Sequence, residues 1–168
     1  ELDTRNDRLL PFSGKYFKFM VDVGVDEKVM YFKTNFEYQL FLHVLRNTYT
    51  KIQTVSHTIH YLDQPVPKSR YFKLGGSSSL RGVDEESLLK TQFHILTLEF
   101  IQQQKRTLQI KSFIDYGLDR VANFKENLYG YGFGIKNVND KIIFSIDYSL
   151  SSRRLESGKI HFKWSARL

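Results

Sequence analysis

The chain has 168 residues, a formal net charge of +7 and an aromatic content of 15%, and it contains no cysteine. This length is enough for one domain with its own core, and the lack of cysteine excludes a disulfide framework and a cysteine-based metal site. No apolar run approaches the ~18 residues of a membrane-spanning helix, whereas the positive charge leaves nucleic acid, anionic lipid and acidic proteins open as partners.

Residues 15–25 and 30–45 are the first two predicted strands, because apolar and polar side chains alternate along them. The apolar side of the first carries Phe17, Phe19, Val21, Val23 and Val25. The apolar side of the second carries Met30, Phe32, Phe36, Tyr38, Leu40, Leu42 and Val44. Charged side chains lie on the opposite sides, so each strand has one apolar and one polar face.

The longest connection covers about residues 63–90 and follows a weaker third strand at residues 48–62. Its middle, FKLGGSSSLRG, holds two adjacent glycines, three serines and the tripeptide Leu-Arg-Gly. A phosphate-binding loop is not expected there, because the Gly-Lys-Ser/Thr ending and a following helix are both missing. Two alternatives stay open from the residues alone: an exposed flexible loop, and a loop that folds back onto the protein.

Five more strands are predicted in the second half of the chain. Alternation is weaker over residues 92–103, 106–117 and 128–138, and clear over residues 141–150 and 159–168. The last strand carries Ile160, Phe162, Trp164, Ala166 and Leu168 on its apolar side. The total is about eight strands without a convincing helix, so the sequence predicts an all-β fold.

Strand length and connection length favour a membrane barrel over a β-sandwich. Several predicted strands run for ten residues or more, whereas a typical globular strand has about five or six. Outer-membrane barrels join antiparallel strands by short turns on one side and long loops on the other. Long and short connections alternate nearly throughout this chain, with residues 151–158 counted as a long one. We therefore expect an antiparallel transmembrane β-barrel with its apolar face in lipid.

Several segments resemble motifs of the BamA/TamA superfamily of outer-membrane assembly and secretion barrels. Residues 72–82 resemble the glycine-rich motif of that family's sixth loop, and Val83 stands where the family has an aromatic residue. The matching loop residues are Gly75, Gly76, Leu80, Arg81 and Gly82. The segment SFIDYG is similar to the family's Phe-x-Asp-x-Gly strand motif, at Phe113, Asp115 and Gly117. The ending GKIHFKW resembles the closing strand, with Leu168 in place of the terminal aromatic.

The resemblance implies that residues 1–168 are the C-terminal part of an outer-membrane barrel, the bacterial surface antigen domain. About eight strands would form the second half of a sixteen-stranded barrel, with residues 63–90 as an inward plug. The implied function is not enzymatic: the protein would insert outer-membrane proteins or translocate proteins across the bacterial outer membrane. Lys159, Phe162 and Trp164 would lie on a seam strand that templates an incoming strand by β-augmentation.

The partners implied by the resemblance are outer-membrane lipids with lipopolysaccharide, nascent outer-membrane or secreted proteins, and accessory periplasmic or lipoprotein subunits. No nucleic acid is expected, because the aromatic residues share a face with aliphatic ones and not with lysine and arginine. No metal or cofactor is expected, because the histidines lack a ligand spacing. A small passive barrel or porin, and a membrane anchor for an upstream enzyme domain, remain as alternatives.

Physical reasoning gives the loop motif a specific partner. Asp115 lies on the polar side of its strand with Gln109 and Lys111, so it faces the barrel interior. A bidentate pair between Arg81 and this carboxylate would fix the loop tip to the wall. The glycines of LYGYGFG, at residues 130, 132 and 134, allow either a close approach of the loop or a tight strand curvature. We also expect this half to be unstable alone, because its terminal strands would leave unpaired edges in lipid.

Overall fold

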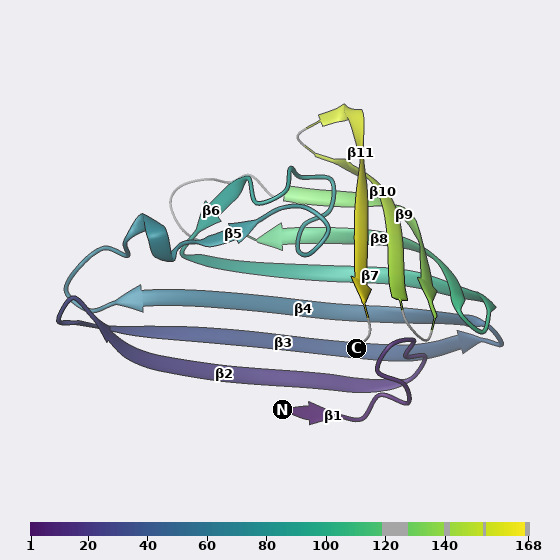
Figure 1. Cartoon of the computed structure of the whole chain (residues 1–168), viewed down its shortest axis with the longest axis horizontal. Coiled ribbons are helices and arrows are strands. Elements are labelled where there is room, and N and C mark those ends of the chain that lie inside the picture. Colours follow the sequence, from purple (N-terminus) through teal and green to yellow (C-terminus); the bar gives the residue numbers. More distant parts are fainter. Residues whose placement is uncertain (119–127, 140–141, 153, 167–168) are drawn as a thin grey trace.

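The computed structural model describes residues 1–118, 128–139, 142–152 and 154–166. Within these ranges, nine strands form one antiparallel sheet in the order β1-β2-β3-β4-β7-β8-β9-β10-β11 (Figure 1). The strands are β1 (Leu2–Asp3), β2 (Gly14–Asp26), β3 (Val29–Leu45), β4 (Thr48–Tyr61), β7 (Gln92–Lys105), β8 (Leu108–Leu118), β9 (Leu128–Val138), β10 (Ile142–Ser151) and β11 (Arg154–Ala166). The connection between β4 and β7 contains a short 3-10 helix, η1 (Lys68–Arg70), and a hairpin of β5 (Phe72–Leu74) and β6 (Leu88–Lys90).

Each of the eight predicted strands is confirmed, in sequence order and with antiparallel pairing between neighbours. The connection predicted as long over residues 151–158 is wrong, because β10 ends at Ser151, β11 begins at Arg154, and these two residues pair across the hairpin. Pairing there depends on backbone groups, which a polar sequence does not reveal. Leu168 and the long connection expected at residues 119–127 lie outside the described residues.

Alternation of side chains gives the sheet two chemically different faces. The outer face carries large apolar side chains that remain exposed, among them Val21, Phe100, Ile114, Phe133, Phe162 and Trp164. Phe32 belongs to the same face and is 37% exposed, so it is not enclosed between two packed sheets as in a β-sandwich. An exposed apolar surface of this extent indicates contact with lipid or with another protein. This arrangement agrees with a β-barrel type of domain.

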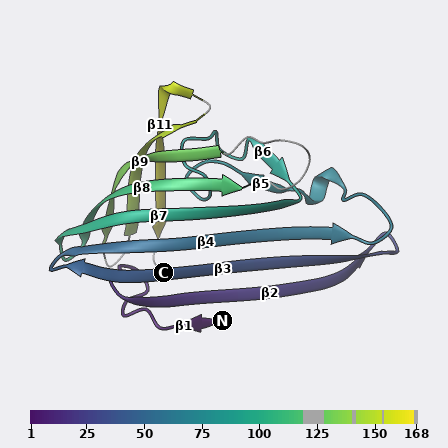
Figure 2. The same ribbon diagram turned by 180° about the vertical axis from the view of Figure 1, so that it is seen from behind.

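The sheet is open, and β1 and β11 are its two edges in the part of the chain that is described. It is also strongly curled: β2, β3, β4 and β7 run side by side, while β9, β10 and β11 turn steeply across them (Figure 1), as the opposite view also shows (Figure 2). The curl brings the segment after β1 to the far strands, where Lys136 Nζ of β9 donates a hydrogen bond to the Leu9 carbonyl oxygen at 2.6 Å.

The core lies between the connection of residues 62–91 and the inner face of β7. Six buried apolar side chains form it: Leu74, Leu80, Val83, Phe93, Ile95 and Leu128. Full burial of one such side chain contributes roughly 1.5–3 kcal/mol, so this cluster holds the connection against the sheet. No helix of the described ranges is both long and apolar enough to cross a membrane.

Candidate functional site

The tip of the connection, residues 75–83, is a compact turn held by its own backbone. The Gly76 N–H donates to the carbonyl oxygens of Leu80 and Val83, each at 3.1 Å. The Ser79 hydroxyl accepts a hydrogen bond from the Gly75 N–H at 2.8 Å and donates one to the Gly75 carbonyl at 3.2 Å. Leu80 and Val83 are buried in the core. The turn therefore presents the intervening Arg81 to the sheet.

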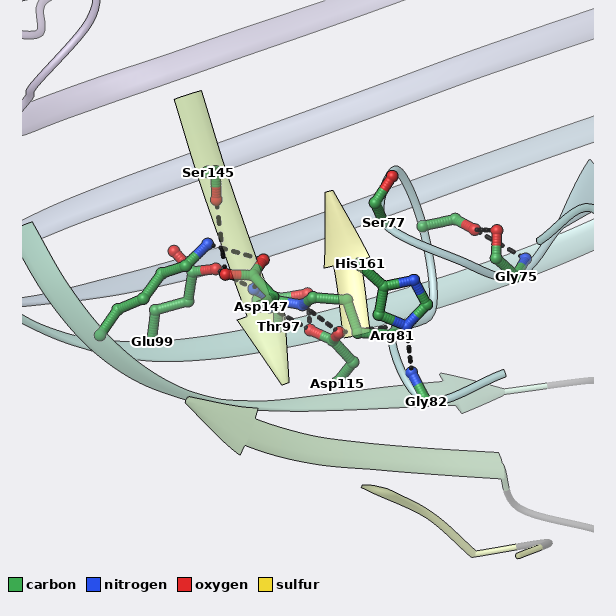
Figure 3. A network of polar contacts seen from close by, with 12 residues as sticks. Gly75, Ser77, Arg81, Gly82, Thr97, Glu99, Asp115, Ser145, Asp147 and His161 are labelled. Atoms are coloured by element: carbon green, nitrogen blue, oxygen red, sulfur yellow. Dashed lines mark hydrogen bonds and ion pairs between the residues drawn. The ribbon is translucent and has the colours of Figure 1, made fainter. Parts of the chain in front are cut away.

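Arg81 forms a two-pronged contact with Asp115 of β8, and the structure thus brings these two sequence-predicted residues together (Figure 3). Nε and Nη2 donate to the two carboxylate oxygens, both at 2.7 Å, and the Arg81 backbone N–H donates to Oδ2 at 3.2 Å. Asp115 is fully buried. The guanidinium also lies 3.4 Å from the centre of the Phe113 ring, a cation–π distance.

The arginine has two further carboxylate neighbours that sequence reasoning missed. Nη1 donates to Glu99 Oε1 of β7 at 2.7 Å and lies 3.6 Å from Asp147 Oδ2 of β10. The signal was present in the alternation, since Glu99 and Asp147 both occupy polar-side positions of predicted strands. Alternation alone did not identify them as partners of Arg81, because the curl of the sheet decides which strands meet across the interior.

Charge balance explains how this cluster tolerates burial. Lys51 Nζ lies 3.7 Å from Glu99 Oε2, and Lys111 Nζ lies 2.9 Å from Asp147 Oδ2. With Arg81, these lysines supply three positive charges against the three carboxylates of Asp115, Glu99 and Asp147. A buried ion cluster persists only when its charges and hydrogen bonds are satisfied. Thr97 adds to this by donating from its hydroxyl to Asp115 Oδ1 at 2.8 Å.

Arg81 stays charged in spite of its burial. Burial by itself would lower the pKa of its guanidinium. The hydrogen bond to Asp115 and the negative charges of Glu99, Asp115 and Asp147 outweigh burial and raise this pKa above its ordinary value. The guanidinium of Arg81 therefore keeps its proton, and its positive charge is a constant part of the ion cluster.

Two glycines let the loop lie directly on the sheet. Gly82 has a φ of +89°, in the left-handed region, and a Cβ there would lie 2.6 Å from the Leu150 carbonyl oxygen. A Cβ at Gly130 of β9 would collide with the Arg81 carbonyl oxygen. Gly130 therefore fits a close approach of the loop, one of the two alternatives left open for the LYGYGFG segment.

The other glycines of these motifs have different neighbours. At Gly132 and Gly134 a Cβ would collide with β10, through the Tyr148 carbonyl oxygen and the Asp147 side chain respectively. These two positions fit the alternative of tight strand packing and curvature. Gly117, the glycine of the Phe-x-Asp-x-Gly match, faces Leu80 without a collision, since a Cβ would lie at the van der Waals distance of 3.4 Å from Leu80 Cδ2.

The predicted seam residues lie away from the ion cluster. Phe162 and Trp164 are on the outer face of β11 and are 64% and 71% exposed. Lys159 points the other way, where its ammonium group contacts the Asp84 carboxylate of the loop. A role of these residues in a seam stays a prediction.

A polar cavity of about 520 Å³ lies beside Arg81 on the concave side of the sheet. Charged side chains from β3, β4, β8, β9 and β11 line it, including Glu37, Lys51, Lys111, Lys136 and Lys163. Among the described residues, no three histidine, aspartate or glutamate side chains are grouped closely enough to hold a metal ion. The cavity has the character of a wet interior opposite an apolar exterior.

The comparisons with known proteins give one family. A family model described as the Omp85 superfamily domain matches residues 1–152. The matched region includes the loop tip, Asp115 and Glu99, and stops before β11. The comparison with curated proteins finds no match.

Proposed function

This chain belongs to the Omp85 superfamily, and on that premise we propose that it is the C-terminal part of an outer-membrane barrel that inserts or translocates other proteins. Membership of the superfamily implies protein assembly or translocation at the bacterial outer membrane. The finer proposal is a sixteen-stranded barrel in which residues 1–168 supply the second half and the connection of residues 63–90 is an inward plug.

The bidentate contact of Arg81 with Asp115 is the observation that carries this proposal. It joins a loop between β4 and β7 to the inner wall of β8, at full burial of the carboxylate. A loop fixed across the interior by a balanced ion cluster plugs part of the barrel, whereas an open porin keeps a water-filled channel. An anchored plug instead controls which part of the interior is open, as a barrel that handles other proteins requires.

The edge at β11 supports a seam in this proposal. In the described residues no strand pairs with the outer edge of β11, so its backbone N–H and C=O groups face outward without strand partners. Unpaired backbone groups are costly in lipid and readily accept an added strand. We propose that this edge closes against the first strand of the full barrel and exchanges with a strand of a nascent outer-membrane or secreted protein.

The outer face supports a lipid environment for the same barrel. Its exposed apolar side chains would contact outer-membrane lipids, whereas the charged concave side would face water. Lipopolysaccharide and accessory periplasmic or lipoprotein subunits are proposed partners on the strength of the family alone. The proposed activity is not enzymatic.

Assembly of a client barrel by the full-length protein in proteoliposomes tests the proposal. We expect R81A to lose most of the assembly rate while the protein still inserts. R8A is the matched control, because the Arg8 side chain is 84% exposed. If R81A assembles clients at the parent rate, the Arg81 contact has no part in the function. If the parent itself assembles no client and R81A keeps the parent conductance, the passive-barrel alternative replaces the proposal. An enzyme activity lost on removal of an upstream domain would support the anchor alternative.

A further inference from the structure

We propose that His161 is a positioning residue that ties the loop tip to the last strand, so that docking of the loop also fixes the edge strand β11. The contacts of Gly82 with His161 and of Asp84 with Lys159 are named the strand latch. The consequence of the strand latch for the seam rests on the proposed function. The contact itself can be tested without any client protein.

The first contact of the strand latch comes from the residue that follows Arg81. The Gly82 backbone N–H donates to His161 Nε2 at 3.2 Å (Figure 3), and His161 is only 8% exposed. His161 pairs in register with Asp147 of β10, which lies 3.6 Å from Arg81 Nη1. Two consecutive loop residues therefore reach two adjacent strands near the edge of the sheet.

The second contact lies one position further along the same face of β11. Lys159 and His161 are two residues apart and so point to the same side of the strand. The Lys159 ammonium group pairs with the Asp84 carboxylate, and Glu85 Oε2 lies 3.9 Å from His161 Nδ1. Loop residues 82, 84 and 85 thus face β11 together, and each of the two contacts contributes to the link.

The strand latch completes a set of contacts across the curled part of the sheet. Arg81 and Gly82 together touch five consecutive strands, through Glu99 of β7, Asp115 of β8, Gly130 of β9, Asp147 of β10 and His161 of β11. Contacts from one dipeptide to successive strands require those strands to wrap around it. The loop tip therefore stabilises the curl that brings β11 over the interior.

The hydrogen bond fixes the state of the His161 ring. Nε2 can accept from Gly82 only when the ring is neutral and its proton is on Nδ1, the side toward Glu85. The charged groups near the ring are Glu85 and Arg81 from the loop, Asp147 from β10 and Lys159 from β11.

Glutamine at position 161 can place an acceptor where Nε2 lies, whereas phenylalanine fills the space without an acceptor.

Spin labels on the full-length protein in lipid provide the test, because the chain has no cysteine of its own within these 168 residues. One label pair, at Ser78 and Ser165, reports the distance from loop to β11. A reference pair, at Ser78 and Gln53, reports the distance from loop to wall. Both label pairs, at three positions in all, are made in the parent, in H161F and in H161Q.

We expect H161F to shift the loop-to-β11 pair from one short distance to a broader and longer distribution, with the ratio of latched to released protein reduced about fivefold by the lost hydrogen bond. The reference pair should stay unchanged, and H161Q should restore the short distance. An unchanged distribution in H161F, equal broadening of both pairs, or failure of H161Q to rescue would each overturn the proposal.

If H161F does not fold, K159Q replaces it as the variant and should lengthen the same pair. A short distance retained in K159Q would then contradict the strand latch. Client assembly is measured in parallel. If H161F lengthens the loop-to-β11 distance but assembles clients at the parent rate, the strand latch is supported. The same result contradicts the proposed role of β11 as the seam.

Discussion

At the scale of single residues, Arg81 is constrained by charge balance as well as by geometry. It faces three carboxylates, and two of them are shared with Lys51 and Lys111. Removing the arginine alone leaves an excess of one buried negative charge. A lysine there could not restore the contact, because an ammonium group cannot form the bidentate pair with Asp115.

We expect R81M to destabilise the folded protein by about 3–5 kcal/mol, the range for breaking a buried ion pair by removing one partner. The double variant R81M/D115N removes one charge of each sign, so it should be less destabilised than R81M alone. The unfolding temperature of the inserted barrel, read from its heat-modifiable migration in gels, measures both. A double variant as unstable as the sum of its single variants would show that charge balance is not the cause.

Two glycines give a matched pair of tests for the close approach of the loop. At Gly130 an added Cβ would collide with the Arg81 carbonyl oxygen, whereas at Gly117 it would lie 3.4 Å from Leu80 Cδ2. We expect G130A to displace the loop at a cost of about 1–3 kcal/mol or more and G117A to be nearly neutral. Protease sensitivity of residues 75–83 in the inserted protein measures displacement. Equal sensitivity of the two variants would contradict the close approach.

At the scale of elements, period-two alternation was enough to predict all eight long strands, because each strand has one apolar face and one polar face. The short elements β1, β5 and β6 were missed, since two or three residues hold no period. The start of β11 was placed too late, because pairing of Arg154 with Ser151 depends on backbone groups alone.

The candidate site was predictable only in part. A family resemblance together with the polar side of one strand led to Arg81 and Asp115. Glu99, Asp147 and His161 lie on strands far from the loop in sequence, and the curl of the sheet decides that they meet it. His161 had no ligand-like spacing, so nothing in its local sequence indicated that it faces Gly82.

Opposite faces of β2 provide a test of the lipid-facing side. Val21 belongs to the outer face and is 51% exposed, while the adjacent Met20 points to the concave side. A lysine on the lipid face of a barrel costs up to about 2–4 kcal/mol near the bilayer midplane, and little on the interior side. We expect V21K to reduce membrane insertion and M20K to leave it close to parent, as measured by the folded fraction after refolding into vesicles. Equal insertion would exclude lipid contact at Val21.

At the scale of the whole molecule, the sheet is curled but not closed. The curl is stabilised from within, by the loop tip and its contacts to five strands, while both edges remain without a neighbouring strand in the described residues. β1 pairs with β2 only at Phe17 and Tyr16, so most of the outer edge of β2 is also open. In the proposed barrel these edges would lie in lipid, which cannot supply hydrogen bonds to them, so the proposal requires strands that pair with both edges.

This openness predicts the behaviour of residues 1–168 when they are produced alone. We expect them to give no single folded monomer in detergent or vesicles, because the edges at β2 and β11 would pair between molecules instead. Size-exclusion chromatography with light scattering, together with heat-modifiable migration, measures this, and a polypeptide that also supplies the missing strands is the control. A monodisperse, heat-modifiable monomer would contradict the expectation, because it would require the edges of this sheet to close on each other. The protein would then form a small barrel by itself, with the ion cluster around Arg81 in its interior.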